Sequence, residues 1–268
     1  MNIPVQFQNQ GSMILGIFHI ANHQKSVPIV IVMCYGLNGN RVVQNRMAVR
    51  LGYLLENHNI NLFRFDYRNV GVSTGRFEKS TIRERVDDII EVCEFVRSCF
   101  HNQKIKIVLL GFSDGARNAL QATRKVTVDG LILWNPIFKI SNLEPLNDHK
   151  KEKLTLHPIY KSPVKKLMGV GIGLEMIRQI ENDTSEECLY KFEKDVFLLF
   201  GDKDKQTVQI SNYLKKCFVS SRTNITYSEI NGSNHLFTKF DHINEVFDRT
   251  IKWVNNRIDE RNHKYEIY

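Results

Sequence analysis

The sequence predicts an α/β fold, in which a mostly parallel central sheet carries helices on both faces. Short, continuously apolar runs rich in β-branched residues, typical of strands buried on both faces, alternate with longer amphipathic segments. This alternation recurs along most of the 268 residues, and repeated strand–helix order favours parallel strands joined by helical crossovers. A chain of this length and composition fits one folded domain with a sizeable core.

Each expected element follows from a local pattern. Buried or half-buried apolar runs predict strands, the first of them antiparallel, at residues 12–20, 28–34, 61–66, 105–110, 128–134, 195–200 and 225–230. Apolar residues at helical spacing predict helices at residues 43–57, 82–100, 114–125, 206–218 and 240–258. Thr81 is placed to cap the second of these helices.

Residues 137–193 interrupt the alternation, because they put far more chain between two strands than a crossover needs. The segment holds three prolines, a concentration of lysines that includes Lys150 and Lys151, and an apolar patch from Leu167 to Ile177. Long insertions at the rim of an α/β sheet are commonly lids or binding elements. We therefore expect a core of residues 1–136 and 194–268 and an inserted helical cap over 137–193.

Composition narrows the class of partner and the compartment. The net charge is +8, which favours an acidic partner or simply a solvated basic surface. Five cysteines without metal-like spacing fit free thiols in a reducing compartment. The chain opens without a signal-peptide pattern and has no apolar stretch long enough to span a bilayer, so we expect a cytoplasmic protein. Neither a metal nor a cofactor is expected, nor is nucleic-acid binding, because no basic helix or zinc spacing is present.

Residues 111–115, Gly-Phe-Ser-Asp-Gly, form a G-x-S-x-G motif with an informative context. The motif directly follows the strand at 105–110 and opens the next helix, which is the arrangement of a nucleophile elbow. Glycines on both sides allow a tight turn, and a helix N-terminus favours negative charge near Ser113. The alternative is a glycine-flanked turn with a capping serine. A second match around Ser73 lies beyond the end of its strand with no apolar helix after it, so we interpret Ser73 as a loop residue.

A nucleophilic serine needs a histidine base, and that base needs an orienting acid. His235 follows the strand at 225–230 and precedes the last helix, a placement that the other eight histidines lack. Asp204 follows the strand at 195–200 at a distance that lets its carboxylate turn towards the histidine, with Asp202 as the reserve choice. For the oxyanion of a tetrahedral intermediate, we expect the backbone N–H groups of Leu37 and Asp114 as donors.

These segments together resemble the α/β-hydrolase superfamily. The similarity rests on residues 35–40 (Tyr-Gly-Leu-Asn-Gly-Asn), residues 65–75, the elbow and the histidine loop, and it covers almost the whole chain in motif order. The order serine, aspartate, histidine is the one expected for this superfamily. Within it, the chain is similar to bacterial carboxylesterases of the cinnamoyl/feruloyl esterase group and related acyl hydrolases and thioesterases. The resemblance implies a Ser113–Asp204–His235 triad and a cap that shapes the acyl pocket, with substrate contacts at Tyr35, Met168, Ile172 and Met176.

Two positions depart from the family pattern. Tyr35 stands where the family usually has a histidine before glycine, which affects the oxyanion loop but removes no triad member. Asn69 stands where Arg-Gly-x-Gly is usual, and asparagine tolerates the positive φ that such a turn requires.

The sequence thus predicts a serine hydrolase that cleaves carboxylic esters through an acyl-enzyme. One alternative is a thioesterase or acyltransferase acting on coenzyme A or acyl carrier protein thioesters, since both carriers are acidic and the insertion is basic. A second alternative is a non-catalytic hydrolase homologue that binds a small molecule.

Overall fold

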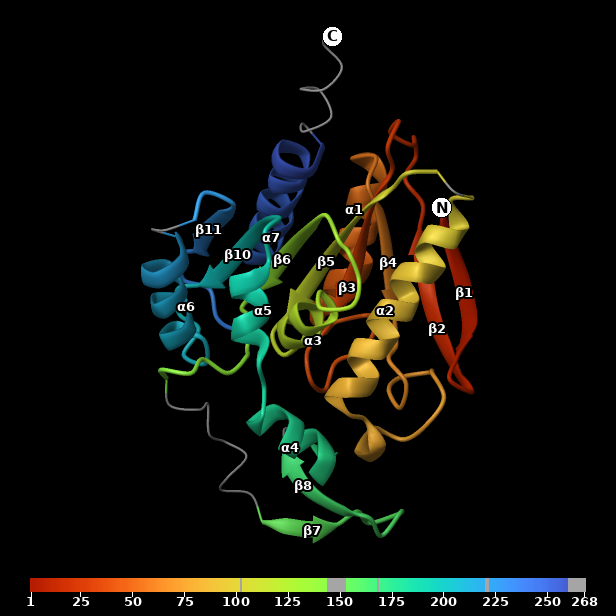
Figure 1. The fold of residues 1–268 in the computed structure, drawn as a ribbon, viewed down its shortest axis with the longest axis vertical. Helices are drawn as coiled ribbons and strands as arrows, with labels where there is room; N and C mark the ends of the chain where they lie inside the picture. Colours follow the sequence, from red (N-terminus) through yellow and green to blue (C-terminus); the bar gives the residue numbers. More distant parts are fainter. Residues whose placement is uncertain (102, 144–152, 168, 220–221, 260–268) are drawn as a thin grey trace.

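An eight-stranded sheet forms the centre of the molecule (Figure 1). The computed structural model describes residues 1–101, 103–143, 153–167, 169–219 and 222–259. Within these residues the spatial order of the strands is β1-β2-β4-β3-β5-β6-β10-β11. Their bounds are Asn2–Asn9 (β1), Ser12–His19 (β2), Ile29–Cys34 (β3), Asn61–Phe65 (β4), Lys106–Phe112 (β5), Gly130–Trp134 (β6), Asp195–Gly201 (β10) and Ile225–Ile230 (β11).

The sheet is parallel except at one edge. Strands β1 and β2 pair antiparallel, β2 pairs antiparallel with β4, and the strands from β4 to β11 are parallel neighbours. Strand β3 shows why its apolar run is continuous: alternate residues enter hydrophobic clusters on opposite faces of the sheet, and all six are buried. Because β5, β10 and β11 run in the same direction, their carboxyl ends meet at one edge of the sheet.

Helices cover both faces of the sheet. Residues of α1 and α7 contribute to the hydrophobic cluster on one face, whereas α2, α3, α5 and α6 contribute to the cluster on the other (Figure 1). The Oγ1 of Thr81 accepts a hydrogen bond of 3.1 Å from the N–H of Glu84, which confirms the expected cap. No described helix is both long and apolar enough to cross a bilayer. The helix bounds are Met47–Asn57 (α1), Ile82–Cys99 (α2), Gly115–Ala122 (α3), Leu174–Glu181 (α4), Ser185–Lys191 (α5), Val208–Leu214 (α6) and Phe240–Trp253 (α7).

The segment at 137–193, expected to be helical, contains a small sheet as well as α4 and α5. Strands β7 (Leu154–Leu156), β8 (Pro163–Leu167) and β9 (Val170–Gly173) pair antiparallel in that order. In Figure 1 this sheet and α4 extend from one end of the central sheet, close to the start of α2. The N–H of Arg83 in α2 donates to the Gln179 side chain of α4 at 2.9 Å, which ties the insertion to the core.

Candidate active site

Ser113 lies on the sharp turn between β5 and α3, where its φ is +57°. Residues other than glycine rarely adopt this left-handed conformation. The neighbouring glycines are required by space: a Cβ on Gly111 would lie 2.5 Å from the Cα of Ala116, and one on Gly115 would overlap the carbonyl oxygen of Cys34. These obstacles are backbone atoms that cannot rotate aside, so the two glycines allow β3, β5 and α3 to approach closely at this turn.

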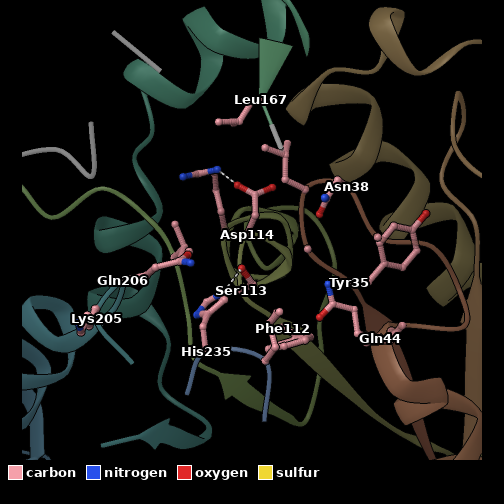
Figure 2. A pocket seen from close by; sticks show the side chains of 17 residues that line it. Tyr35, Asn38, Gln44, Phe112, Ser113, Asp114, Leu167, Lys205, Gln206 and His235 are labelled. Atoms are coloured by element: carbon pink, nitrogen blue, oxygen red, sulfur yellow. Dashed lines mark hydrogen bonds and ion pairs between the residues drawn. The ribbon is translucent and has the colours of Figure 1, made fainter. Parts of the chain in front are cut away.

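Three side chains from three different strand ends form one hydrogen-bonded series. The Oγ of Ser113 lies 2.8 Å from Nε2 of His235 (Figure 2). Nδ1 of the same ring lies 2.7 Å from Oδ2 of Asp204. The serine follows β5, the aspartate follows β10, and the histidine follows β11. Although these residues are far apart in the chain, the parallel sheet brings them to the same edge. The series allows a proton to pass from the serine to the imidazole.

The contacts of Asp204 favour its ionised form. It is 2% exposed, and burial alone would raise its pKa. The interactions with His235 and hydrogen bonds from the Thr207 hydroxyl and the Gln206 N–H outweigh that effect and hold the pKa of Asp204 below its usual value. An ionised Asp204 orients the imidazole with its protonated Nδ1 towards the carboxylate, which leaves Nε2 free to accept the proton of Ser113.

The alternative aspartate, Asp202, and the alternative serine, Ser73, both make contacts away from His235. The carboxylate of Asp202 lies 3.5 Å from the Lys203 ammonium, and the described contacts place Asp204 on the histidine instead. The hydroxyl of Ser73 donates to the Asp66 carbonyl and accepts from the N–H of Leu15, so Ser73, a loop residue as expected, joins this loop to β2. Asn69 has a φ of +68°, which confirms that asparagine supports the turn in place of glycine.

The two expected oxyanion donors flank the nucleophile. Gly36 approaches so closely that a Cβ on it would lie 3.2 Å from the Cβ of Ser113, and this loop carries the N–H of Leu37. The N–H of Asp114 lies directly after Ser113 at the start of α3. Among the described residues, neither N–H donates a hydrogen bond. Neither N–H is therefore committed to an acceptor within the described part of the chain.

Asn135, which the sequence did not single out, holds the histidine loop. It lies at the end of β6 and is completely buried. Its Nδ2 donates to the carbonyl oxygen of His235 at 2.8 Å, and its Oδ1 accepts from the N–H of Gly201 at 2.8 Å. One amide thus connects the ends of β6 and β10 to the loop after β11. The only sequence signal was a polar residue at the end of a buried strand.

A cavity of about 320 Å³ opens above Ser113 (Figure 2). Among the described residues, no group of three or more His, Cys, Asp or Glu side chains is arranged to hold a metal ion. The cavity combines apolar walls with a few polar groups, as small-molecule sites commonly do. The apolar side chains are Leu37, Val43, Phe112, Ile137, Leu167 and Leu236, and the polar or charged ones include Asn38, Gln44, Arg117, Lys205 and Gln206.

Of the described residues that were expected to bind substrate, Tyr35 lines this cavity and the other two do not. Tyr35 lines it, but its ring is 1% exposed and its hydroxyl accepts a hydrogen bond of 2.8 Å from the Tyr67 N–H. That phenol therefore holds the loop after β4. Ile172 and Met176 do not line the cavity, because their apolar side chains are buried in the hydrophobic core. Met168 lies outside the described residues, and its neighbour Leu167 reaches the cavity instead.

Comparison with known families gives one match over most of the chain. Residues 30–207 match the family model Hydrolase_4, described as serine aminopeptidase, S33. A search of curated protein sequences found no match.

Solved structures share the fold at low sequence identity. Est1E from Butyrivibrio proteoclasticus, solved with ferulic acid bound, has a TM-score of 0.76 and 17% identity, covering 95% of this chain and 99% of that one. The α/β hydrolase GrgF from Penicillium sp. sh18 has a TM-score of 0.72 and 14% identity, covering 96% and 99%. The esterase domain of a Rhodothermus marinus protein has a TM-score of 0.66 and 16% identity, covering 96% and 99%. These similarities establish the α/β-hydrolase fold.

Proposed function

Because the chain belongs to the serine aminopeptidase S33 family (Hydrolase_4) and has the α/β-hydrolase fold, we propose that it cleaves carboxylic esters as a serine hydrolase. One observation carries the proposal: Ser113, which lines a cavity of about 320 Å³, begins a hydrogen-bonded series that runs through His235 to the buried Asp204. A serine hydroxyl is a weak nucleophile unless a base accepts its proton and a third group orients that base.

The proposed reaction has two halves. The Oγ of Ser113 attacks the ester carbonyl carbon while His235 Nε2 takes the hydroxyl proton, and Asp204 stabilises the imidazolium. The N–H groups of Leu37 and Asp114 donate to the oxyanion of the tetrahedral intermediate. Collapse of that intermediate breaks the ester C–O bond, the alcohol leaves with the proton from His235, and an acyl-enzyme remains. A water molecule, deprotonated by His235, then attacks the acyl carbon and releases the acid, and the proton returns to Ser113.

Ester rather than amide substrates are favoured by the solved structures with a similar fold. Est1E binds ferulic acid, a carboxylic acid, and the Rhodothermus marinus structure is that of an esterase domain. The family description points to an aminopeptidase. The cavity supports a small acyl group, because its wall near Ser113 includes the apolar side chains of Phe112, Ile137 and Leu236.

A thioester substrate on an acidic carrier is the second candidate. The observation in its favour is the position of two exposed lysines in the insertion. Lys161 lies just before β8 and Lys166 lies within it, and the last residue of β8, Leu167, lines the cavity. Lys150 and Lys151 lie outside the described residues. An acyl carrier protein or the phosphates of coenzyme A would be attracted to such a surface.

A substrate panel tests the proposal. It comprises p-nitrophenyl esters of graded acyl length, an aminoacyl p-nitroanilide, and acyl-CoA and acyl carrier protein thioesters, each with the wild type and Ser113→Ala. We expect ester turnover and covalent labelling by a fluorophosphonate in the wild type, and neither in Ser113→Ala. Labelling that persists in Ser113→Ala would refute the assigned nucleophile. Tight binding of a small molecule by a wild type without turnover would instead favour the non-catalytic alternative.

Salt and charge reversal separate esters from carrier thioesters. If an acidic carrier docks on the insertion, kcat/KM for the carrier-bound substrate falls steeply with added salt and in a Lys161→Glu/Lys166→Glu variant. Turnover of a small p-nitrophenyl ester is then unchanged in that variant and serves as the control. Carrier turnover that is absent, or that responds to neither change, contradicts the thioester candidate.

A further inference from the structure

Arg85 is a charged residue that the proposed mechanism does not use, yet it is completely buried beside the candidate active site. It lies in the first turn of α2. Its Nε donates to the Ser80 hydroxyl at 3.1 Å, and its guanidinium carbon lies 5.3 Å from the centre of the Tyr67 ring. Burial of a cation is costly unless the cation is paired or hydrogen-bonded, so the contacts of the Arg85 guanidinium are needed to stabilise it.

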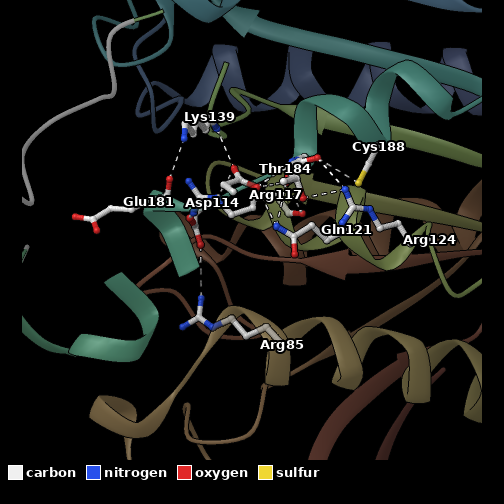
Figure 3. Close-up of polar contacts among 11 residues, drawn as sticks. Arg85, Asp114, Arg117, Gln121, Arg124, Lys139, Glu181, Thr184 and Cys188 are labelled. Carbon is white, nitrogen blue, oxygen red and sulfur yellow. Dashed lines mark hydrogen bonds and ion pairs between the residues drawn. The ribbon is translucent and has the colours of Figure 1, made fainter. Parts of the chain in front are cut away.

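The remaining two nitrogens of Arg85 reach the two residues that carry the expected oxyanion donors. Nη2 donates to the carbonyl oxygen of Leu37 at 2.8 Å. Nη1 lies 3.9 Å from Oδ2 of Asp114, the contact drawn as a dashed line in Figure 3. The residues at 37 and 114 come from different loops, and one guanidinium spans them.

We propose that Arg85 is a positioning residue that holds the oxyanion hole in place and offsets the negative charge beside it. This inference rests on the proposed function. A hydrogen bond to the Leu37 carbonyl restrains the backbone of a residue that lines the cavity and whose N–H is an expected oxyanion donor. A planar guanidinium suits this task, because its donors diverge from one rigid fork.

The negative charge of the Asp114 side chain lies next to the expected oxyanion hole and has to be offset. A carboxylate on the residue that supplies an oxyanion donor would repel the negative charge that develops in the transition state. Two guanidinium groups balance it: Arg117 donates to Oδ1, and Arg85 lies near Oδ2. Within the described part of the chain, Oδ2 of Asp114 and Nη1 of Arg85 are buried without a hydrogen-bond partner. Their interaction is therefore one of charge at 3.9 Å.

Kinetics with a transition-state analogue separate this role from a merely structural one. Arg85→Met is compared with Arg68→Met, which removes another buried arginine that pairs with Asp88 and contacts neither Leu37 nor Asp114. The readouts are kcat and KM for p-nitrophenyl butyrate and the inhibition constant of butylboronic acid, whose tetrahedral serine adduct places an oxygen in the oxyanion hole.

In Arg85→Met we expect kcat to fall by roughly 10-fold to 100-fold, somewhat less than the loss of a whole oxyanion donor, with KM changed by less than about threefold. The inhibition constant of the boronic acid should rise in parallel with the loss of kcat/KM. Adding Asp114→Asn to Arg85→Met should recover part of kcat, because it removes the uncompensated carboxylate. Arg68→Met should not show this parallel loss of kcat and of boronic acid affinity.

The opposite results overturn the inference. A folded Arg85→Met with near wild-type kcat, or an equal loss in Arg68→Met, would show that the buried arginine serves stability alone. If Arg85→Met does not fold, Arg85→Lys keeps the charge but lacks the fork, and an unchanged kcat in that variant would overturn the claim that the fork positions the oxyanion hole. A wild type that is neither active nor labelled by a fluorophosphonate would overturn the proposed function as well, which distinguishes the two failures.

Discussion

The Nε of Arg117 donates a hydrogen bond of 2.8 Å to Oδ2 of Asp183, which joins the helix after the nucleophile turn to the connection between α4 and α5 in the inserted segment. The same carboxylate accepts from the N–H of Lys139 at the start of the insertion and from the side chains of Gln121 and Ser185 (Figure 3 shows the Arg117 and Lys139 side of this network). One buried carboxylate therefore connects the start of the insertion and its α4–α5 connection to α3.

Asp183→Asn should destabilise the protein in a pH-dependent manner. Burial raises the pKa of Asp183, but Arg117 and the hydrogen bonds lower it more, so its folded-state pKa lies below the ordinary value of 3.8. A depressed folded pKa means that the stabilisation is complete above the unfolded pKa and is lost as the pH falls through the folded pKa. We expect a loss of about 3 kcal/mol at neutral pH, since one partner of a buried ion pair is removed.

Urea denaturation of the wild type and Asp183→Asn at several pH values measures this effect. The difference between the two proteins should shrink below about pH 4, where the carboxylate is protonated in the unfolded state and then in the folded state. Glu94→Gln is the control, because Glu94 pairs with Arg97 on the surface and should show little difference at any pH. A pH-independent difference for Asp183→Asn would contradict the electrostatic explanation.

Asp204→Asn should lower kcat far more than Asp202→Asn. An asparagine at 204 can present an N–H to the imidazole and favour the tautomer in which Nε2 can no longer accept the proton of Ser113. We expect kcat to fall by about 10⁴-fold with little change in KM. Asp202→Asn changes the neighbouring carboxylate, which lies beside Lys203, and should leave kcat within about twofold. A larger loss in Asp202→Asn than in Asp204→Asn would assign the acid to Asp202 instead.

A pair of asparagine-to-leucine variants tests the connection through Asn135. Asn135→Leu leaves the N–H of Gly201 and the carbonyl of His235 without partners, so we expect a loss of stability of about 2–4 kcal/mol and a lower kcat. Asn118, also completely buried, has no hydrogen-bond partner for either side-chain atom among the described residues. The same substitution there should be neutral or stabilising by about 1 kcal/mol. Thermal unfolding with an ester assay measures both, and similar destabilisation in the two variants would contradict the assigned role.

The hydrogen-bonded series of Ser113, His235 and Asp204 could be predicted because each member follows a strand that is recognisable from its own residues. Strands β5 and β10 are continuously buried, so their apolar runs are unambiguous, and parallel order then brings their ends together. Arg85 and Asn135 could not be found in this way. Their partners Leu37 and His235 are 48 and 100 residues away in the chain, and nothing local distinguishes either side chain from a surface residue.

The structure of the insertion was harder to predict, because its local sequence does not show which side chains face the pocket or which residues form strands. An apolar side chain that lines a pocket and one that fills the core look alike in sequence, so Ile172 and Met176 were assigned to the pocket although both are core residues. Strand β8 reads Pro-Val-Lys-Lys-Leu, which has no clear apolar alternation, and its pairing with β7 and β9 creates the strand. Strand β1 was missed because only part of it is shielded, through its pairing with β2 at the sheet edge.

The backbone at Ser113 predicts a conflict between activity and stability. Its φ of +57° costs a residue with a Cβ about 1–2 kcal/mol, whereas glycine adopts this conformation freely. Glycine also loses about 0.5–1 kcal/mol more conformational entropy on folding than alanine does. The balance favours glycine, so we expect Ser113→Gly to be more stable than Ser113→Ala by about 0.5–1 kcal/mol, with both variants inactive. Urea denaturation compares them directly. Equal stability, or a less stable Ser113→Gly, would mean that the turn stores no strain and that the serine is held there at no cost.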